Sequence, residues 1–185
     1  MLRTRVGYSG GTTDKPTYRS MGDHTEAIQI EYDPKKVSFS KLLELFAKDH
    51  NPFAKSWSTQ YKAVLWTHGA EQAKAAQAWA TALAKERGKS ITTEIRPAQR
   101  FWIAEGYHQK YYLRSRKYLL QELLGISATD KQILDSTLAA CANGWVTGAG
   151  DAKQIEREAK ILGLNERQRK ALKDALGKRA EALCR

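Results

Sequence analysis

Cysteine is scarce in this sequence. The 185 residues include only two, Cys141 and Cys184. Two cysteines are too few for a disulfide framework, and their separation does not match the ligand spacing of a metal site. This usage favours a reducing compartment, most simply the cytosol, and leaves a single Cys141–Cys184 bridge as an alternative.

Long apolar segments are also absent. No apolar run approaches the roughly 20 residues that a membrane-spanning helix needs. Residues 1–5 lack the apolar core that a secretory signal peptide requires. The mean hydropathy of −0.59 and the apolar content of 42% are typical of a globular protein. The length suits one domain with its own core plus an appendage.

Acidic residues are outnumbered, with 20 Asp and Glu against 31 Lys and Arg, which gives a net charge of +11. Such an excess suits either an anionic partner, such as nucleic acid, or a basic protein without one. The two signs are interspersed over most of the chain, which favours the second interpretation. The feature that suggests an anionic partner is a basic cluster near the C-terminus: Glu166-Arg167-Gln168-Arg169-Lys170 with Lys173, Lys178 and Arg179.

The apolar pattern predicts alternating strands and helices. Period-two alternation predicts a strand over residues 26–32, with Ile28, Ile30 and Tyr32 on one face. Further strands are predicted over residues 4–7, 61–66 and 91–95. Helices are predicted over residues 38–50, 70–87, 109–124, 130–142, 152–162 and 166–183.

A polar loop precedes the strand at residues 26–32. Gly10 and Gly11 permit positive φ and close backbone approach, and Pro16 stiffens the loop. Long loops of this kind are more often functional or disordered than mere connections. The loop is therefore the first place to look for a site.

This loop and the segments after it resemble the peptide methionine sulfoxide reductase A family over about residues 3–115. The motifs occur in the family's order: Val6-Gly7-Tyr8-Ser9-Gly10-Gly11, Pro16-Thr17-Tyr18, His24-Thr25-Glu26, Tyr32-Asp33-Pro34, Thr59-Gln60-Tyr61, Ile91-Thr92-Thr93-Glu94-Ile95 and Ala104-Glu105-Gly106-Tyr107-His108-Gln109. The resemblance implies an α/β fold, an α+β two-layer sandwich with a mixed sheet and flanking helices. It implies that domain for residues 1–125 and leaves residues 126–185 as a helical C-terminal extension.

The resemblance also implies thiol-dependent reduction of peptide methionine (S)-sulfoxide. Glu26 resembles the acid that protonates the oxygen, a role that needs a raised pKa, which burial would supply. Tyr18 and Tyr61 resemble the hydroxyl donors that hold this oxygen. The alternatives are a surface glutamate and two packed aromatic residues. The family implies no bound cofactor or metal, an external thiol reductant such as thioredoxin, and oxidised proteins or free methionine sulfoxide as substrates.

The sequence departs from the family pattern in three places. The family's Gly-Cys-Phe-Trp-Gly nucleophile segment is absent, and Met1 aligns with an internal family position. We therefore expect a longer form that carries the nucleophile; the alternative is a non-catalytic module that binds methionine sulfoxide. Ser56 stands where the family has a site aspartate, with Trp57 beside it as a candidate apolar wall. Gly106 replaces another aspartate.

Two further residues are candidates near the site. His108, with its neighbours Glu105 and Tyr107, is interpreted as structural support, and His108 also as a substrate-binding residue. Cys141 precedes the glycine-bearing stretch of residues 143–150, where family members often carry resolving cysteines. It is a possible resolving thiol, although a cysteine in a helical, alanine-rich setting is more often a small buried apolar residue.

Overall fold

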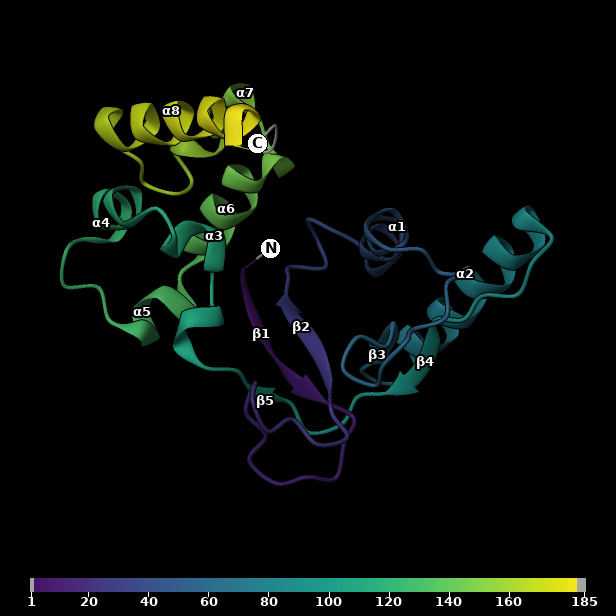
Figure 1. The fold of residues 1–185 in the computed structure, drawn as a ribbon. Coiled ribbons are helices and arrows are strands. Elements are labelled where there is room, and N and C mark those ends of the chain that lie inside the picture. Colours follow the sequence, from purple (N-terminus) through teal and green to yellow (C-terminus); the bar gives the residue numbers. More distant parts are fainter. Residues whose placement is uncertain (1, 183–185) are drawn as a thin grey trace. The chain divides into compact units, whose positions relative to one another are not determined.

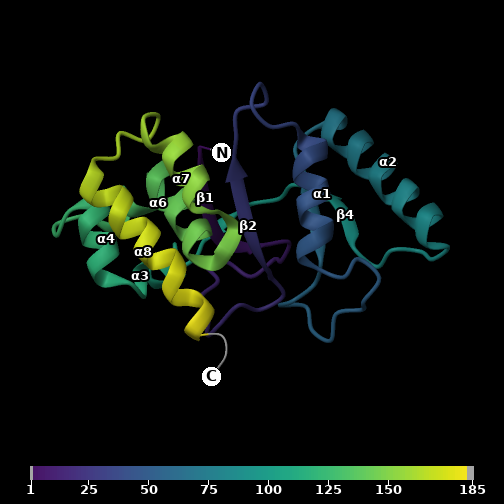
Figure 2. The same ribbon diagram turned by 90° about the horizontal axis from the view of Figure 1, so that it is seen from above.

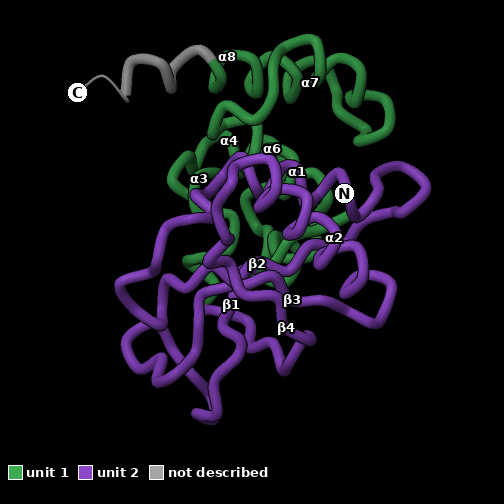
Figure 3. Tube along the Cα trace, turned by 90° about the vertical axis from the view of Figure 1, so that its right-hand side faces the viewer, with its two compact units in different colours: residues 1–5, 105–185 green, residues 6–104 purple. Residues whose placement is uncertain are grey.

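The chain packs into two compact units, which the computed structural model describes over residues 2–182, with α8 side chains described as far as residue 176. One unit comprises residues 6–104, and the other comprises residues 1–5 and 105–185 (Figure 3). This division by packing lies upstream of the boundary after residue 125 that the sequence predicts. That boundary separates a family-like segment from an extension, and it stays a prediction.

The unit of residues 6–104 contains two small sheets (Figure 1). Strands β1 (Arg3–Ser9), β2 (Thr25–Glu31) and β5 (Trp102–Ile103) form a sheet in the order β2-β1-β5. Strands β3 (Val64–Thr67) and β4 (Glu94–Pro97) form a parallel pair. Gly7 pairs with Ile103 in the antiparallel β1–β5 ladder. A Cβ atom at Gly7 would lie 2.1 Å from the Trp102 carbonyl oxygen, so only glycine fits here.

Helices α1 (Phe39–Asp49) and α2 (Ala70–Arg87) pack against each other in this unit (Figure 2). The Ser38 hydroxyl caps α1 by accepting a hydrogen bond from the Lys41 amide at 3.1 Å. Gly88 ends α2 in the left-handed conformation at φ +61°. Helix α2 has the predicted bounds, α1 lies within the predicted residues 38–50, and the mixed α/β class agrees with the prediction.

Two predicted strands are shifted along the chain. The strand predicted at residues 61–66 begins at Val64 instead, because the Lys62 amide donates to the Thr59 carbonyl oxygen in a turn. The strand predicted at residues 91–95 begins at Glu94, because the Thr92 and Thr93 amides both donate to the Pro52 carbonyl oxygen. In each case a loop contact captures the backbone that the strand would have used.

The second unit is helical. Its elements are η1 (Gly106–His108), α3 (Tyr111–Arg114), α4 (Lys117–Leu124), α5 (Asp130–Asp135), α6 (Thr137–Gly144), the π-turn η2 (Trp145–Ala149), α7 (Ala152–Ala159) and α8 (Glu166–Ala182). Two predicted helices are each divided. The helix predicted at residues 109–124 is broken between α3 and α4, and the one predicted at residues 130–142 is broken at Ser136. The Ser136 hydroxyl accepts a hydrogen bond from the Ala139 amide and so starts α6 afresh.

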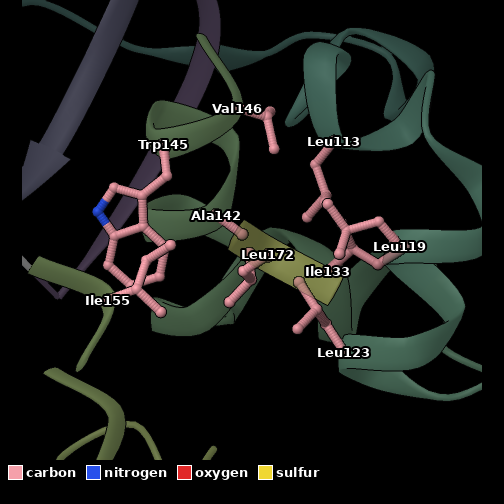
Figure 4. Packing of buried hydrophobic residues seen from close by; sticks show 10 residues of the cluster. Leu113, Leu119, Leu123, Ile133, Ala142, Trp145, Val146, Ile155 and Leu172 are labelled. Atoms are coloured by element: carbon pink, nitrogen blue, oxygen red, sulfur yellow. The ribbon is translucent and has the colours of Figure 1, made fainter. Parts of the chain in front are cut away.

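The core of the helical unit is apolar and closely packed (Figure 4). Leu113, Ile155 and Leu172 are fully buried in it, together with the Trp145 indole. Gly150 lies against that indole, where a Cβ would come within 2.2 Å of Cδ1. Gly150 therefore permits close packing on the Trp145 indole.

A buried lysine joins the chain start to the helical unit. Lys110 Nζ donates to the Thr4 carbonyl oxygen at 2.5 Å and to the Leu134 carbonyl oxygen at 3.3 Å. Burial, followed by the positive charge of Arg5, lowers the pKa of Lys110 to about 8. Among the described residues, no helix combines the length and apolar character needed to cross a membrane.

Candidate functional site

The polar loop before β2 is held by the two residues that end it. The Asp23 carboxylate accepts hydrogen bonds from the Thr12 and Thr13 amides and hydroxyls at 2.9–3.1 Å. These donors, led by the Thr12 amide, hold the pKa of Asp23 well below its usual value. His24 Nδ1 accepts from the Gly11 amide at 3.1 Å, so Nε2 carries the proton and donates to the Thr13 carbonyl oxygen at 2.7 Å.

The start of β2 is tied to the segment that carries Tyr61. The Thr25 hydroxyl donates to the Thr59 carbonyl oxygen at 2.9 Å, and the Glu26 amide donates to the Gln60 carbonyl oxygen at 3.0 Å. These two bonds bring two motifs, separated by more than 30 residues in sequence, side by side. Glu26 and Tyr61 consequently meet at one place.

Three residues predicted for the site, Tyr18, Glu26 and Tyr61, interact in one cluster. The Tyr18 and Tyr61 phenols are hydrogen bonded to each other, and Glu26 interacts electrostatically with Tyr61. Desolvation, followed by the charges of Tyr18 and Glu26, raises the pKa of Tyr61. A phenol in this setting stays protonated at neutral pH and acts as a donor.

The expected burial of Glu26 is not observed, since its side chain is exposed at the start of β2. Tyr18 and Tyr61 are 44% and 46% exposed, so neither is a core aromatic residue. The cluster lies open to solvent. Burial of the acid would therefore have to come from a bound ligand or segment.

An apolar cavity adjoins the cluster. It has a volume of about 440 Å³ and is lined by Glu26 and Tyr61 as well as by apolar residues. The apolar lining comes mainly from β2, α1 and β3: Ile28, Ile30, Leu42, Leu43, Phe46, Val64, Leu65 and Trp66. This volume is within the range of small-molecule pockets and exceeds what one methionine side chain fills.

Trp57 and Ser56 precede Tyr61 in the same loop. The Trp57 ring lies 5.1 Å from the Tyr61 ring, centroid to centroid, and is 83% exposed. It presents an apolar surface beside the phenol, as its candidate role requires. The Ser56 hydroxyl donates to the Ser58 carbonyl oxygen at 2.7 Å and so stabilises the conformation of the loop.

His108 belongs to the helical unit. Its Nε2 lies 4.0 Å from a Glu105 carboxylate oxygen, and its ring packs on Tyr107 with centroids 4.2 Å apart. A Cβ at the neighbouring Gly106 would lie 2.6 Å from the Asp130 carboxylate, so glycine at this position leaves room for the Asp130 side chain. These contacts fit a supporting role for Glu105, Tyr107 and His108 within their unit.

Cys141 lies in α6, half-buried against the helical core. Burial, followed by the charge of Glu158, raises the pKa of its thiol to about 11. The stretch 143–150 is not an open tail: Trp145 and Val146 are buried, and Asn143 Oδ1 accepts from the Leu113 amide. Cys184 lies outside the described residues, and within them no group of three metal-binding side chains occurs.

Gln60 contacts both Glu26 and Tyr61, although no role is predicted for it from sequence. Its Nε2 lies 2.7 Å from Glu26 Oε1 and 3.2 Å from Tyr61 Oη. The signal available was its place in the Thr59-Gln60-Tyr61 motif. A glutamine carries no charge, however, and its partners could not be read from spacing.

Comparison with known proteins identifies the family of this chain. A sequence model described as "Peptide methionine sulfoxide reductase" matches residues 1–138. The chain belongs to the peptide methionine sulfoxide reductase family. It is 40% identical over 171 residues to "Peptide methionine sulfoxide reductase" of Drosophila melanogaster, covering 91% of this chain and 68% of that protein.

Two further family members extend the comparison. The chain is 39% identical over 151 residues to "Peptide methionine sulfoxide reductase A5" of rice, covering 78% of this chain and 59% of that protein. The crystal structure of reduced Mxr1 from Saccharomyces cerevisiae aligns with a TM-score of 0.56 and 28% identity, covering 60% of this chain and 70% of that one. The chain thus spans about three fifths to two thirds of the length of the Drosophila and rice proteins.

Proposed function

We propose that this chain recognises methionine sulfoxide and takes part in its thiol-dependent reduction to methionine, as a peptide-methionine (S)-S-oxide reductase that repairs oxidised proteins. The observation that carries the proposal is the cluster of Tyr18, Tyr61 and Glu26 beside an apolar cavity. A sulfoxide has an oxygen rich in negative charge next to an apolar thioether. A cluster of neutral donors beside an apolar cavity complements both parts.

Each group has a chemical task in this proposal. The Tyr18 and Tyr61 hydroxyls donate to the sulfoxide oxygen, and Glu26 delivers a proton to it as the S–O bond breaks. The two electrons come from thiols: one sulfoxide and two thiols yield one thioether, one disulfide and water. A bound ligand would cover Glu26, which is exposed in the free protein.

The source of the thiol decides between two candidate functions. Cys141 is half-buried, and burial raises the pKa of its thiol to about 11, which leaves little thiolate at neutral pH. With an external reductant such as thioredoxin, the chain is a reductase component. Without one, it is a module that binds the sulfoxide and leaves it unchanged.

The test uses the purified full chain and the two sulfur epimers of N-acetyl-methionine sulfoxide methylamide. We expect the S epimer to bind, measured by titration calorimetry, and Tyr61→Phe to weaken binding about tenfold, because one hydrogen bond is lost. Tyr118→Phe is the matched control, since Tyr118 is an exposed tyrosine of α4 that does not line the cavity. Equal binding of both epimers, or unchanged affinity in Tyr61→Phe, would contradict the proposal.

Turnover is measured separately. The S epimer is incubated with the chain and either thioredoxin with its reductase or dithiothreitol, and methionine formation is followed by chromatography. Methionine above the rate without protein supports the reductase. Binding without turnover supports the sulfoxide-binding module.

The remaining parts of the proposal concern partners and location. We propose oxidised proteins and free methionine sulfoxide as substrates, and no bound cofactor. We propose the cytosol as the compartment, because the chain contains so little cysteine. An anionic-partner role is less favoured. Arg167 pairs with Glu122 at 2.8 Å, while Arg169 and Lys173 both pair with Glu156, and Lys178 and Arg179 lie beyond the described side chains.

A further inference from the structure

We propose that Gln60 is a positioning residue of the candidate site, whose side-chain amide fixes the orientation of both Glu26 and Tyr61. This inference rests on the proposed function for its consequence in binding, but its geometry is testable without any ligand. Gln60 would not touch the substrate. It would act through the two residues that do.

The contacts of Gln60 form a fork. A primary amide carries two N–H donors on one nitrogen. Gln60 Nε2 lies 2.7 Å from Glu26 Oε1 and 3.2 Å from Tyr61 Oη, so each partner takes one proton. A neutral side chain thus holds an acid and a phenol at a fixed separation without adding charge to the site.

The backbone makes this fork rigid. The Gln60 carbonyl oxygen accepts from the Glu26 amide at 3.0 Å, and the neighbouring Thr59 carbonyl oxygen accepts from the Thr25 hydroxyl at 2.9 Å. Gln60 and Glu26 are therefore joined through both main chain and side chain. Such double attachment removes the freedom that an exposed glutamate otherwise has.

The fork decides where each proton points. With Glu26 Oε1 accepting from Gln60, the proton that the acid delivers belongs on Oε2. With Tyr61 Oη accepting from Gln60, its own O–H is directed away from Gln60, to Tyr18 in the free protein and to the sulfoxide oxygen in the complex. On reaction the Oε2–H bond breaks, an O–H bond forms on the sulfoxide oxygen, and the resulting carboxylate keeps its bond from Gln60.

The first test examines the ligand-free protein by side-chain amide NMR. The two Nε2 protons of Gln60 are assigned in the full chain and in Glu26→Gln and Tyr61→Phe. We expect Glu26→Gln to shift mainly one proton and Tyr61→Phe mainly the other, with Gln77 as a matched exposed glutamine whose protons do not move. The fork is refuted if neither Nε2 proton shifts in either variant, or if shifts occur in only one of the two variants.

The second test measures binding of N-acetyl-methionine-(S)-sulfoxide methylamide. Gln60→Met keeps the length of the side chain and removes both donors, and we expect about tenfold weaker binding, with Gln77→Met unchanged. Gln60→Glu replaces donors by acceptors, so it should bind worse than Gln60→Met near pH 8. It should recover relative to Gln60→Met as the pH falls and the new carboxyl group gains a donor proton.

These two measurements distinguish a failure of the proposed function from a failure of the positioning role of Gln60. If the wild-type chain does not bind the sulfoxide, the proposed function fails while the NMR result still decides the fork. If the wild type binds and Gln60→Met binds equally well, the positioning role fails and the proposed function stands. A purely structural role would weaken binding in Gln60→Met and Gln60→Glu alike at every pH, which would also overturn the inference.

Discussion

Lys110 makes the stability of the helical unit depend on pH in an unusual direction. It is 4% exposed and its pKa is lowered from 10.5 to about 8, chiefly by burial. Between these values the unfolded chain binds a proton that the folded chain does not, so stability rises with pH. Each pH unit between the two pKa values is worth about 1.4 kcal/mol, which puts the penalty for charging buried Lys110 at about 3 kcal/mol below pH 8.

The perturbation is Lys110→Met, which keeps a long, unbranched side chain at the same left-handed backbone position, φ +52°. It loses the bonds to the Thr4 and Leu134 carbonyl oxygens at all pH values, which gives a constant offset. The pH-dependent part of the difference is what reports the buried charge. We expect the wild type to gain about 3 kcal/mol relative to Lys110→Met between pH 7 and pH 10.5.

The assay is urea unfolding followed by far-ultraviolet circular dichroism at half-unit pH steps. Exposed Lys117→Met serves as the control and should parallel the wild type. Comparing the free energies of unfolding of the variants at each pH cancels the contributions of other groups that titrate in this range. Parallel stability curves for wild type and Lys110→Met would refute the argument that a charged amine is buried at a cost.

Two further predictions concern the helical unit. In a Cys184→Ser background, Cys141 should react with iodoacetamide at pH 8 about a hundredfold more slowly than a peptide cysteine, because its pKa of about 11 leaves little thiolate; a peptide-like rate in the folded protein would show that the thiol is not buried. Gly106→Asp should lose about 1 kcal/mol of stability by urea unfolding, since its Cβ would lie 2.6 Å from the Asp130 carboxylate and would push this exposed group away from its bond with Arg114. Gly144→Ala, whose Cβ would meet nothing closer than 3.9 Å, is the control, and equal stability of the two variants would contradict the clash.

Local rules predicted the elements whose ends are set by their own residues. The period-two alternation of β2 and the bounds of α2 were readable from sequence. Each of these signals lies within a few residues of the feature that it specifies. Tertiary contacts do not disturb them.

Elements set by distant contacts were not readable. The strand predicted at residues 91–95 is displaced because Thr92 and Thr93 bond to Pro52, about 40 residues away. Lys110, with a positive φ, delays the start of the helix predicted at residues 109–124 to Tyr111, while its amine reaches Thr4. Helix periodicity contains no information about such partners.

The site divides in the same way. Family motifs pointed to Tyr18, Glu26 and Tyr61, and the structure places these three together. The exposure of Glu26 and the fork made by Gln60 could not be predicted, because burial and hydrogen-bond partners depend on how the loops close. Their roles in chemistry stay predictions until the binding experiments are done.

The outer edge of β2 has a consequence for handling the protein. Among the described residues β2 is the last strand of its sheet, and it carries Ile28 at 60% exposure beside Ile30. A strand edge with exposed isoleucines is a template onto which another chain adds a strand. Concentrated samples should therefore lose monomer through strand pairing between copies of the unit of residues 6–104. Ile28→Lys would slow that loss, as charged residues on natural edge strands do.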